Sequence, residues 1–332
     1  MIPIFSGLSR GALGSALGLG CLIAGAAPLE AGTGFQPWLE GVRREAEELG
    51  ISRDTIAAAL GNVAPIPRVI ELDRHQLEFT LSLEDYLAHI VSDRRVEDGR
   101  TRLRANRELI QRIAAEFGVQ PRFIIALWGI ESNYGADTGE FPVIGALVTL
   151  AHDGRRSSYF RNELFNAMRI LDAGHVTVEA MTGSWAGAMG QSQFMPSSFL
   201  EFAVDYDGDG RRDIWTSKAD VFASIANYLA NYGWRSDITW GRMVRLPPEF
   251  DLRHASLDRF KTLGAWQALG VRREDGRDLP IRQLAAALVV PDSEGGGPAY
   301  LVYDNFQALM KWNPSTFFAT AVGHLSDRIG AP

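Results

Sequence analysis

The chain has 332 residues, of which 46% are hydrophobic and 22% are charged, a composition typical of a globular protein rather than of a disordered or fibrous one. Its formal net charge of −7 excludes a general nucleic-acid binder, because such a protein needs a basic surface to displace counterions from phosphates. The length is sufficient for more than one compact unit.

Residues 1–31 are small and apolar after Arg10, and they predict a secretory signal peptide cleaved after Ala26, with the mature protein in the periplasm. The apolar run is short for a retained membrane helix, which needs about 17–25 residues. Cys21 offers a second route, in which the GLGC sequence is lipidated and the protein becomes an outer-membrane lipoprotein; a membrane is a partner only in that case. We favour simple cleavage, because glycine fits the first position of the lipidation motif poorly. Either way, the mature chain has no cysteine for a disulfide, a thiolate metal site or a cysteine nucleophile.

The pattern of apolar residues predicts a mainly α, α+β protein with several parts. Residues 34–117 read as an N-terminal helical domain, with apolar residues at helical spacing beneath charged faces. Residues 118–236 read as a second, largely helical core with a glycine-rich loop region. Within residues 237–303, the stretches GRMVRLPPEF, AAALVVPD and GPAYLVYD read as short strands separated by turns, which predict a small β-containing domain. Residues 304–330 return to helix and are expected to pack back on the core and the helical domain.

The stretch ALWGIESNYG, residues 126–135, places a glutamate in the last turn of a predicted helix. Leu127, Trp128 and Glu131 recur at helical spacing, so the Glu131 carboxylate shares the apolar face and points into the protein. Burial and the negative end of the helix dipole both raise the pKa of such a carboxyl group. Cleavage of a glycosidic bond requires an acid that is protonated near neutral pH. The alternative is a buried glutamate that only hydrogen-bonds to the next loop.

The stretch GSWAGAMGQSQFMPSSF, residues 183–199, combines small residues with polar side chains. The small residues allow a ligand to approach the backbone, and Ser184, Gln191 and Gln193 offer hydrogen bonds suited to sugar hydroxyl and acetamido groups. The alternative is a tight loop wedged between helices. GQSQF ends in phenylalanine where a serine-hydrolase elbow needs glycine, so Ser192 is not a predicted nucleophile.

These two motifs, with VIGALVTLAHDGRRSSYFRNEL between them, resemble the soluble lytic transglycosylases of the membrane-bound B type, glycoside hydrolase family 103. The resemblance runs from about residue 36 to the C-terminus. It implies a lysozyme-like core flanked by a helical domain and a small β domain. It also implies cleavage of the bond between N-acetylmuramic acid and N-acetylglucosamine in peptidoglycan, with release of a 1,6-anhydromuramoyl end. Glu131 would be the sole catalytic acid/base, without a catalytic cofactor. The implied partners are glycan strands and proteins of cell-wall synthesis or hydrolysis.

The resemblance also implies glycan contacts position by position. Ser184 would orient the 2-acetamido group, Gln193 would bind the glycan, and Asn313 would hold the site around Glu131. The implied aromatic contacts are Tyr86, Tyr159, Tyr228, Trp312 and Phe318. Relatives carry tyrosines where this chain has Trp312 and Phe318, so at these two positions we expect stacking on sugar faces rather than a hydroxyl hydrogen bond.

The stretch VDYDGDGRRDIW, residues 204–215, matches the start of an EF-hand loop, with aspartates at positions one, three and five and Gly210 at position six. Thr216 replaces the usual glutamate at position twelve. We expect a single structural Ca2+ rather than a sensor pair. The resemblance adds two ligands, the backbone carbonyl of Arg211 and the carboxylate of Asp220. The expected ligands are therefore Asp205, Asp207, Asp209, Arg211 and Asp220. The alternative is a solvated acidic turn that caps the next helix.

Two other functions are also consistent with the sequence. A hydrolytic muramidase would pair Glu131 with a second carboxylate about 5–9.5 Å away, for which Asp137 and Glu140 are the nearest in sequence. A non-catalytic peptidoglycan-binding scaffold would keep the fold without turnover. The presence of Ser184 and Gln193 together with Glu131 favours the enzyme.

Overall fold

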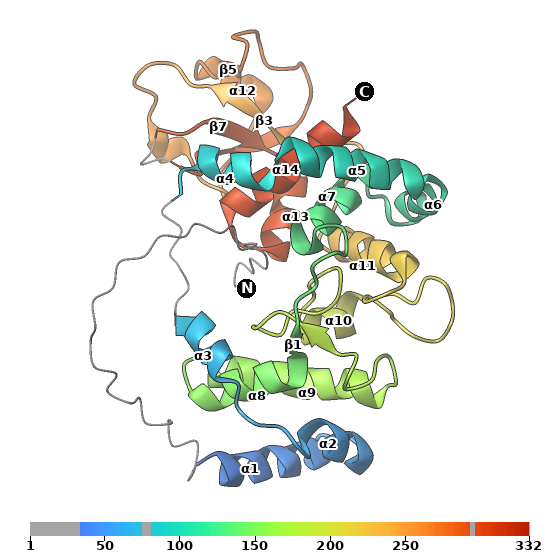
Figure 1. Cartoon of the computed structure of the whole chain (residues 1–332). Coiled ribbons are helices and arrows are strands. Elements are labelled where there is room, and N and C mark those ends of the chain that lie inside the picture. The colour runs from blue at the N-terminus through green and yellow to red at the C-terminus, as the bar shows by residue number, and fades with distance from the viewer. Residues whose placement is uncertain (1–33, 75–80, 293–295, 332) are drawn as a thin grey trace, which may run out of the picture.

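The computed structural model in Figure 1 describes residues 34–74, 81–292 and 296–331. The predicted signal peptide, its cleavage after Ala26 and the lipidation of Cys21 lie outside the described residues and stay predictions.

Most of the described chain is helical, as the composition and periodicity predict. The helices of the first half are α1 (Phe35–Glu48), α2 (Arg53–Leu60), α3 (Pro67–Arg74), α4 (Leu83–Ile90), α5 (Asp93–Ala105), α6 (Arg107–Phe117), α7 (Pro121–Ser132), α8 (Val143–Asp153) and α9 (Ser157–Asp172). Those of the second half are α10 (Pro196–Phe202), α11 (Lys218–Asn231), α12 (Leu263–Ala268), α13 (Asp304–Trp312) and α14 (Thr316–Gly330).

The strands form two sheets. The small one pairs β1 (Phe141–Pro142) with β2 (Thr182–Gly183). The larger one is antiparallel in the order β4-β6-β7-β3-β5, and its strands are β3 (Gly241–Arg245), β4 (Phe260–Thr262), β5 (Arg272–Arg273), β6 (Ala285–Val289) and β7 (Ala299–Val302). All five strands of this sheet lie within residues 237–303. The sequence predicted β3, β6 and β7 but not the edge strands β4 and β5, which are too short for a period of two to be recognised.

The two central strands connect the β-containing part to the rest of the protein. The main core extends from Phe35 to Ile329, and a smaller core extends from Ile238 to Tyr303. Successive side chains of a strand point to opposite faces of the sheet, so β6 and β7 contribute alternately to the two cores. The side chains that face the main core are Ala287, Val289, Tyr300 and Val302, and those that face the smaller one are Ala286, Leu288, Ala299 and Leu301. Burial on both faces explains why AAALV and AYLV are continuously apolar.

The helices of residues 34–117 form two groups in space rather than one unit. Helices α2 and α3 contact α9 and α8, whereas α4, α5 and α6 contact α14, α7 and α11. In Figure 1, α1 and α2 lie beside α8 and α9 at one end of the molecule, and α4 to α6 lie near α14 at the other. Periodicity within each helix shows which face is buried but not against which helix, so the sequence could not separate the groups.

Among the described residues, no single helix is both long and apolar enough to cross a membrane. Helices α6 and α7 together satisfy the length and composition, but they are bent by 109° at the break between them.

Candidate active site

Helix α7 carries Glu131 in its last turn. The helix begins at Pro121, where the missing N–H and the fixed φ of proline are favourable, and its side chains from Phe123 to Gly129 are buried all round. The surrounding core therefore fixes the axis and rotation of the helix. Glu131 itself is only partly buried, but the protein around its carboxyl group raises the pKa of Glu131 to about 8 through desolvation. This is the direction expected from the sequence.

A turn with unfavourable backbone angles follows Glu131. Asn133, Tyr134 and Gly135 have φ of 49°, 60° and 83°, so three successive residues are in the left-handed region. This conformation is uncommon for an aromatic residue. Tyr134 is held in it by an edge contact with Trp128, with ring centroids 5.5 Å apart, and by its hydroxyl, which donates to the carbonyl of Arg95 at 2.7 Å. Such strain persists only where the surroundings over-determine it, and it is concentrated at functional sites.

Gln191 joins α7 to the glycine-rich loop and to the aspartate loop. Trp128 Nε1 donates to Gln191 Oε1 at 2.8 Å, and Gln191 Nε2 donates to the carbonyl of Trp215 at 2.7 Å. A Cβ on Gly135 would lie 2.3 Å from Gln191 Oε1, which explains why glycine occupies that position. The sequence predicted that Gln191 binds a sugar, but both ends of its side-chain amide are hydrogen-bonded within the protein.

Replacing Gln191 with leucine is expected to destabilise the fold by about 2–4 kcal/mol, because it leaves a buried indole N–H and a carbonyl without partners. The matched control is Ser192→Ala at the next position. Ser192 is fully buried and its hydroxyl has no hydrogen-bond partner among the described residues, so this change should be neutral or slightly stabilising. Urea unfolding of both variants measures the difference; equal stability of the two would contradict the structural role of Gln191.

Ser184 shapes the start of the glycine-rich loop. Its Oγ accepts the N–H groups of Ala186 at 3.3 Å and Ala188 at 3.1 Å, and the side chain is 3% exposed. The turn after α7 packs directly on this backbone, because a Cβ on Gly139, whose φ is 88°, would lie 2.2 Å from the Gly183 carbonyl oxygen. Both accepted bonds leave the hydroxyl proton of Ser184 available for donation.

Gln193 has a buried acceptor with no protein partner. Its Nε2 donates to the carbonyls of Thr138 at 3.0 Å and Gly190 at 2.9 Å, which fixes the orientation of the amide. Its Oε1 is buried and has no hydrogen-bond partner among the described residues. The backbone of Gln193 is also left-handed, with φ of 49°. A buried acceptor left open in a strained residue is the pattern expected of a group that receives an N–H or O–H from a ligand.

The aromatic residues expected to stack on sugars differ in exposure. Tyr159 is 39% exposed, whereas Tyr86, Tyr228, Trp312 and Phe318 are between 3% and 6% exposed. The hydroxyl of Tyr228 donates to the carbonyl of Lys311 at 2.7 Å. Tyr159 thus offers substantial exposed surface, whereas the other four offer very little. Their contacts with glycan stay predictions.

The hydrogen bond on Glu131 comes from a residue that the sequence did not assign to this role. Trp312 Nε1 donates to Glu131 Oε1 at 2.6 Å. Asn313 was expected to hold the site around Glu131, but its Oδ1 accepts the N–H of Ser315 at 3.1 Å. Burial and the nearby Glu131 carboxylate raise the pKa of Tyr86 far above its ordinary value. No local pattern could have revealed the indole bond, because its partners lie far apart in the chain.

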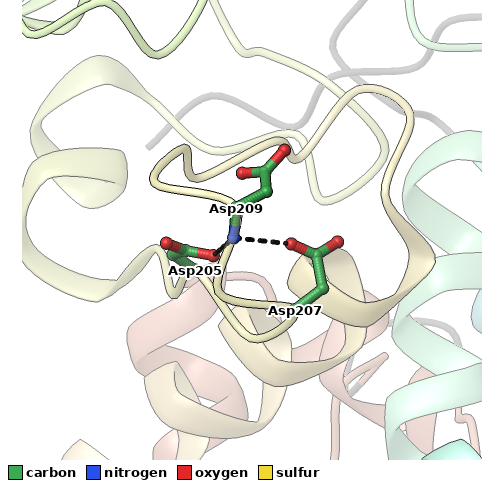
Figure 2. A group of neighbouring side chains, drawn as sticks. All are labelled: Asp205, Asp207 and Asp209. Carbon is green, nitrogen blue, oxygen red and sulfur yellow. Dashed lines mark hydrogen bonds between the residues drawn. The ribbon is translucent and has the colours of Figure 1, made fainter.

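Figure 2 shows the aspartate loop, in which the side chains of Asp205, Asp207 and Asp209 lie close together. One oxygen from each of Asp205, Asp207 and Asp209 lies within 4.8 Å of the others. The N–H of Asp209 donates to Asp205 at 3.2 Å and to Asp207 at 3.3 Å. Oxygen ligands of Ca2+ lie about 2.3–2.6 Å from the ion, so oxygens this far apart can share one.

Asp220 is placed differently from these three. It is fully buried, and its two carboxylate oxygens accept the N–H groups of Tyr206 at 2.8 Å and Asp213 at 2.7 Å. Asp220 thus holds together Tyr206 and Asp213, which lie near the two ends of the loop. Its role as a ligand, like that of the Arg211 carbonyl, stays a prediction.

Residues 34–327 match the family described as Transglycosylase SLT domain. Membrane-bound lytic murein transglycosylase B of Escherichia coli (strain K12) is 30% identical over 229 residues, which are 64% of this chain and 58% of that relative. The match thus spans little more than half the length of that relative.

Two solved structures are also similar. SltB3 from Pseudomonas aeruginosa, in complex with NAG-NAM-pentapeptide, is 42% identical with a TM-score of 0.87, over 91% of this chain and 81% of that one. The Escherichia coli lytic transglycosylase Slt35, in complex with calcium, is 26% identical with a TM-score of 0.76, over 88% of this chain and 92% of that one.

Proposed function

The chain belongs to the Transglycosylase SLT domain family, and we propose on this basis that it is a peptidoglycan lytic transglycosylase. It cleaves the β-1,4 bond between N-acetylmuramic acid and N-acetylglucosamine and leaves 1,6-anhydromuramoyl ends. The observation that carries the proposal is the Glu131 carboxyl group, whose raised pKa of about 8 keeps it protonated at neutral pH. The lytic activity of the Escherichia coli relative and the NAG-NAM-pentapeptide bound to SltB3 support the substrate class.

One carboxyl group performs both halves of this reaction. Glu131 first donates its proton to the glycosidic oxygen as the bond to C1 of the muramoyl sugar breaks. The 2-acetamido carbonyl stabilises the positive charge at C1. Glu131, now a carboxylate, removes the proton of the C6 hydroxyl as its oxygen bonds to C1. The proton returns to Glu131, and no water is consumed. A second carboxylate such as Asp137 or Glu140 is therefore unnecessary.

The polar groups of the glycine-rich loop suit the acetamido group. The Oε1 of Gln193, which is buried and has no partner among the described residues, would accept an N–H or O–H from the glycan, and the hydroxyl proton of Ser184 would be donated to the acetamido carbonyl oxygen. Together they orient the group that stabilises C1.

Digestion of purified peptidoglycan followed by mass spectrometry tests the proposal. A lytic transglycosylase gives fragments lighter by one water than those of a hydrolase. Reducing ends would identify a hydrolytic muramidase instead, and the absence of fragments would identify a non-catalytic binder. Either of these two results would overturn the proposal.

The proposed site of action is the periplasm, where peptidoglycan lies. The support is the small, apolar character of residues 1–31. Fractionation of cells that express the full chain checks this location. Labelling with radioactive palmitate, with Cys21→Ser as the control, distinguishes lipidation from simple cleavage.

We further propose that the aspartate loop binds one structural Ca2+. The three carboxylates are close enough together to share one ion, and the similarity to Slt35, whose structure is in complex with calcium, supports the assignment. Asp205, Asp207 and Asp209 would hold the ion, whose charge offsets their mutual repulsion. Glu131 and the reaction steps do not depend on it.

Removal of Ca2+ is expected to lower the melting temperature by about 5 °C. A site loaded at 100 times its Kd stabilises the folded state by about 2.7 kcal/mol, and each kcal/mol shifts the melting temperature of a chain of this size by about 2 °C. Calorimetry in excess Ca2+ and in EDTA measures the shift, and Asp209→Asn should remove most of it. Identical melting in both buffers would contradict Ca2+ binding.

A further inference from the structure

Trp312 is held rigidly against Glu131. It ends α13 and is 181 residues from Glu131 in the sequence, yet its Nε1 lies 2.6 Å from Glu131 Oε1. The indole ring packs against Tyr228 and Phe194, with ring centroids 4.7 Å and 5.3 Å away, and it is 4% exposed. Such packing fixes the direction of the N–H, and it leaves too little free ring surface for Trp312 to act mainly by stacking on a sugar.

The indole N–H can donate a hydrogen bond but cannot accept one. A carbonyl or carboxylate oxygen is a better acceptor than the hydroxyl oxygen of a carboxylic acid. The bond at 2.6 Å therefore favours Oε1 of Glu131 as the acceptor in both protonation states and Oε2 as the carrier of the acid proton. We infer that Trp312 is a positioning residue that decides which carboxyl oxygen of Glu131 donates and receives the proton. The inference rests on the proposed function, which it deepens.

Fixing one oxygen benefits both halves of the reaction. The proton must leave toward the glycosidic oxygen, which is bonded to C1 of the muramoyl sugar before cleavage, and later be taken from the C6 hydroxyl of that same sugar. A carboxyl group free to carry its proton on either oxygen would spend part of its time with the proton directed away from the substrate. Misplacement of a reacting group by about 1 Å costs about 10²-fold in rate.

The same bond moderates the acidity of Glu131. Desolvation raises the pKa of Glu131, and the hydrogen bond from Trp312 lowers it by a smaller amount, because the charged carboxylate is the better acceptor. Two further groups lie near. Tyr86 on α4 interacts electrostatically with Glu131, and Arg95 on α5 interacts with Tyr86. Replacement of Trp312 removes neither group, so we expect a change in the pH profile to report on the indole bond.

The obvious variant, Trp312→Phe, removes the N–H but also leaves a cavity in the core. The sharper test places β-(3-benzothienyl)alanine at position 312 through a suppressed stop codon; its sulfur replaces the N–H and the ring shape is kept. Tryptophan inserted by the same route is the control. We expect kcat to fall about 10- to 100-fold, KM and the melting temperature to change little, and the alkaline limb of the pH profile to shift upward. An unchanged kcat, or a change in KM alone, would overturn the inference.

Infrared difference spectroscopy gives a readout that does not need turnover. Subtracting the spectrum of Glu131→Gln isolates the stretch of the protonated Glu131 carboxyl group. Loss of the indole hydrogen bond should move this band to higher wavenumber in the benzothienylalanine protein. An unmoved band would exclude the bond even if activity fell. If the natural protein released no anhydro ends, the proposed function would fail, whereas the band would still show whether Trp312 orients the proton.

Discussion

Replacing Glu131 with glutamine is expected to reduce the release of anhydromuramoyl fragments by about 10³–10⁴-fold. A general acid contributes about 10²–10⁴-fold, and here one group serves as both acid and base, so the loss lies toward the upper end. Glutamine has nearly the same shape, and its carbonyl oxygen can still accept the Trp312 N–H, so the site should stay assembled. The variant should therefore bind peptidoglycan as the natural protein does. Fragment release by mass spectrometry and sedimentation with insoluble peptidoglycan measure the two properties.

Asp137→Asn and Glu140→Gln are the matched controls for this prediction. Asp137 is partly buried and Glu140 is exposed, and both lie in the turn after α7. Neither should lose more than a few-fold in rate, because no step uses a second carboxylate. A loss at Asp137 as deep as that at Glu131, accompanied by reducing ends, would show a two-carboxylate hydrolase. Residual turnover of Glu131→Gln at more than about a tenth of the natural rate would exclude Glu131 as the acid.

The sequence predicted the position of Glu131 because its inward direction depends on local geometry. Spacing by three and four along one helix places Glu131 with Leu127 and Trp128, and the desolvation of its carboxyl group agrees with an inward direction. The helix is buried on every side from Phe123 to Gly129, so its burial alone does not single out one face. The central strands β6 and β7 were identified for a similar reason, since a short, continuously apolar run bounded by turns is a local signal.

The partners of Glu131 could not be predicted in this way. The Trp312 bond depends on how α13 returns to α7 after the whole β-containing part, and nothing near either residue encodes it. The hydrogen bonds of Gln191 and Gln193, within one loop, could not be predicted from the sequence either. Both looked equally suited to a glycan, but the fold engages the first fully and leaves the Oε1 of the second open. The difference arises from tertiary neighbours, Trp128 and Trp215 in the first case.

The stability of Glu131→Gln is expected to exceed that of the natural protein by an amount that grows with pH. In the folded state the pKa of Glu131 is about 8, against 4.5 for an ordinary glutamate. Between these values the folded protein keeps a proton that the unfolded chain releases, so the free energy of unfolding falls as pH rises. Each pH unit in this interval costs about 1.36 kcal/mol, which sets an upper limit of about 5 kcal/mol above pH 8. Glutamine does not titrate, so the variant avoids this loss.

Urea unfolding of both proteins at pH 4, 6 and 8.5 measures this difference. The difference in free energy of unfolding between Glu131→Gln and the natural protein should be nearly constant below pH 4.5, increase through neutral pH and level off above pH 8. Glu140→Gln, an exposed position, should show no comparable trend. The gain in stability together with the loss of turnover in one variant is the trade-off expected of a catalytic group held in an unfavourable environment. A gap that does not change with pH would mean that Glu131 ionises as it would in water, and the protein would then have no acid at this site to start glycan cleavage.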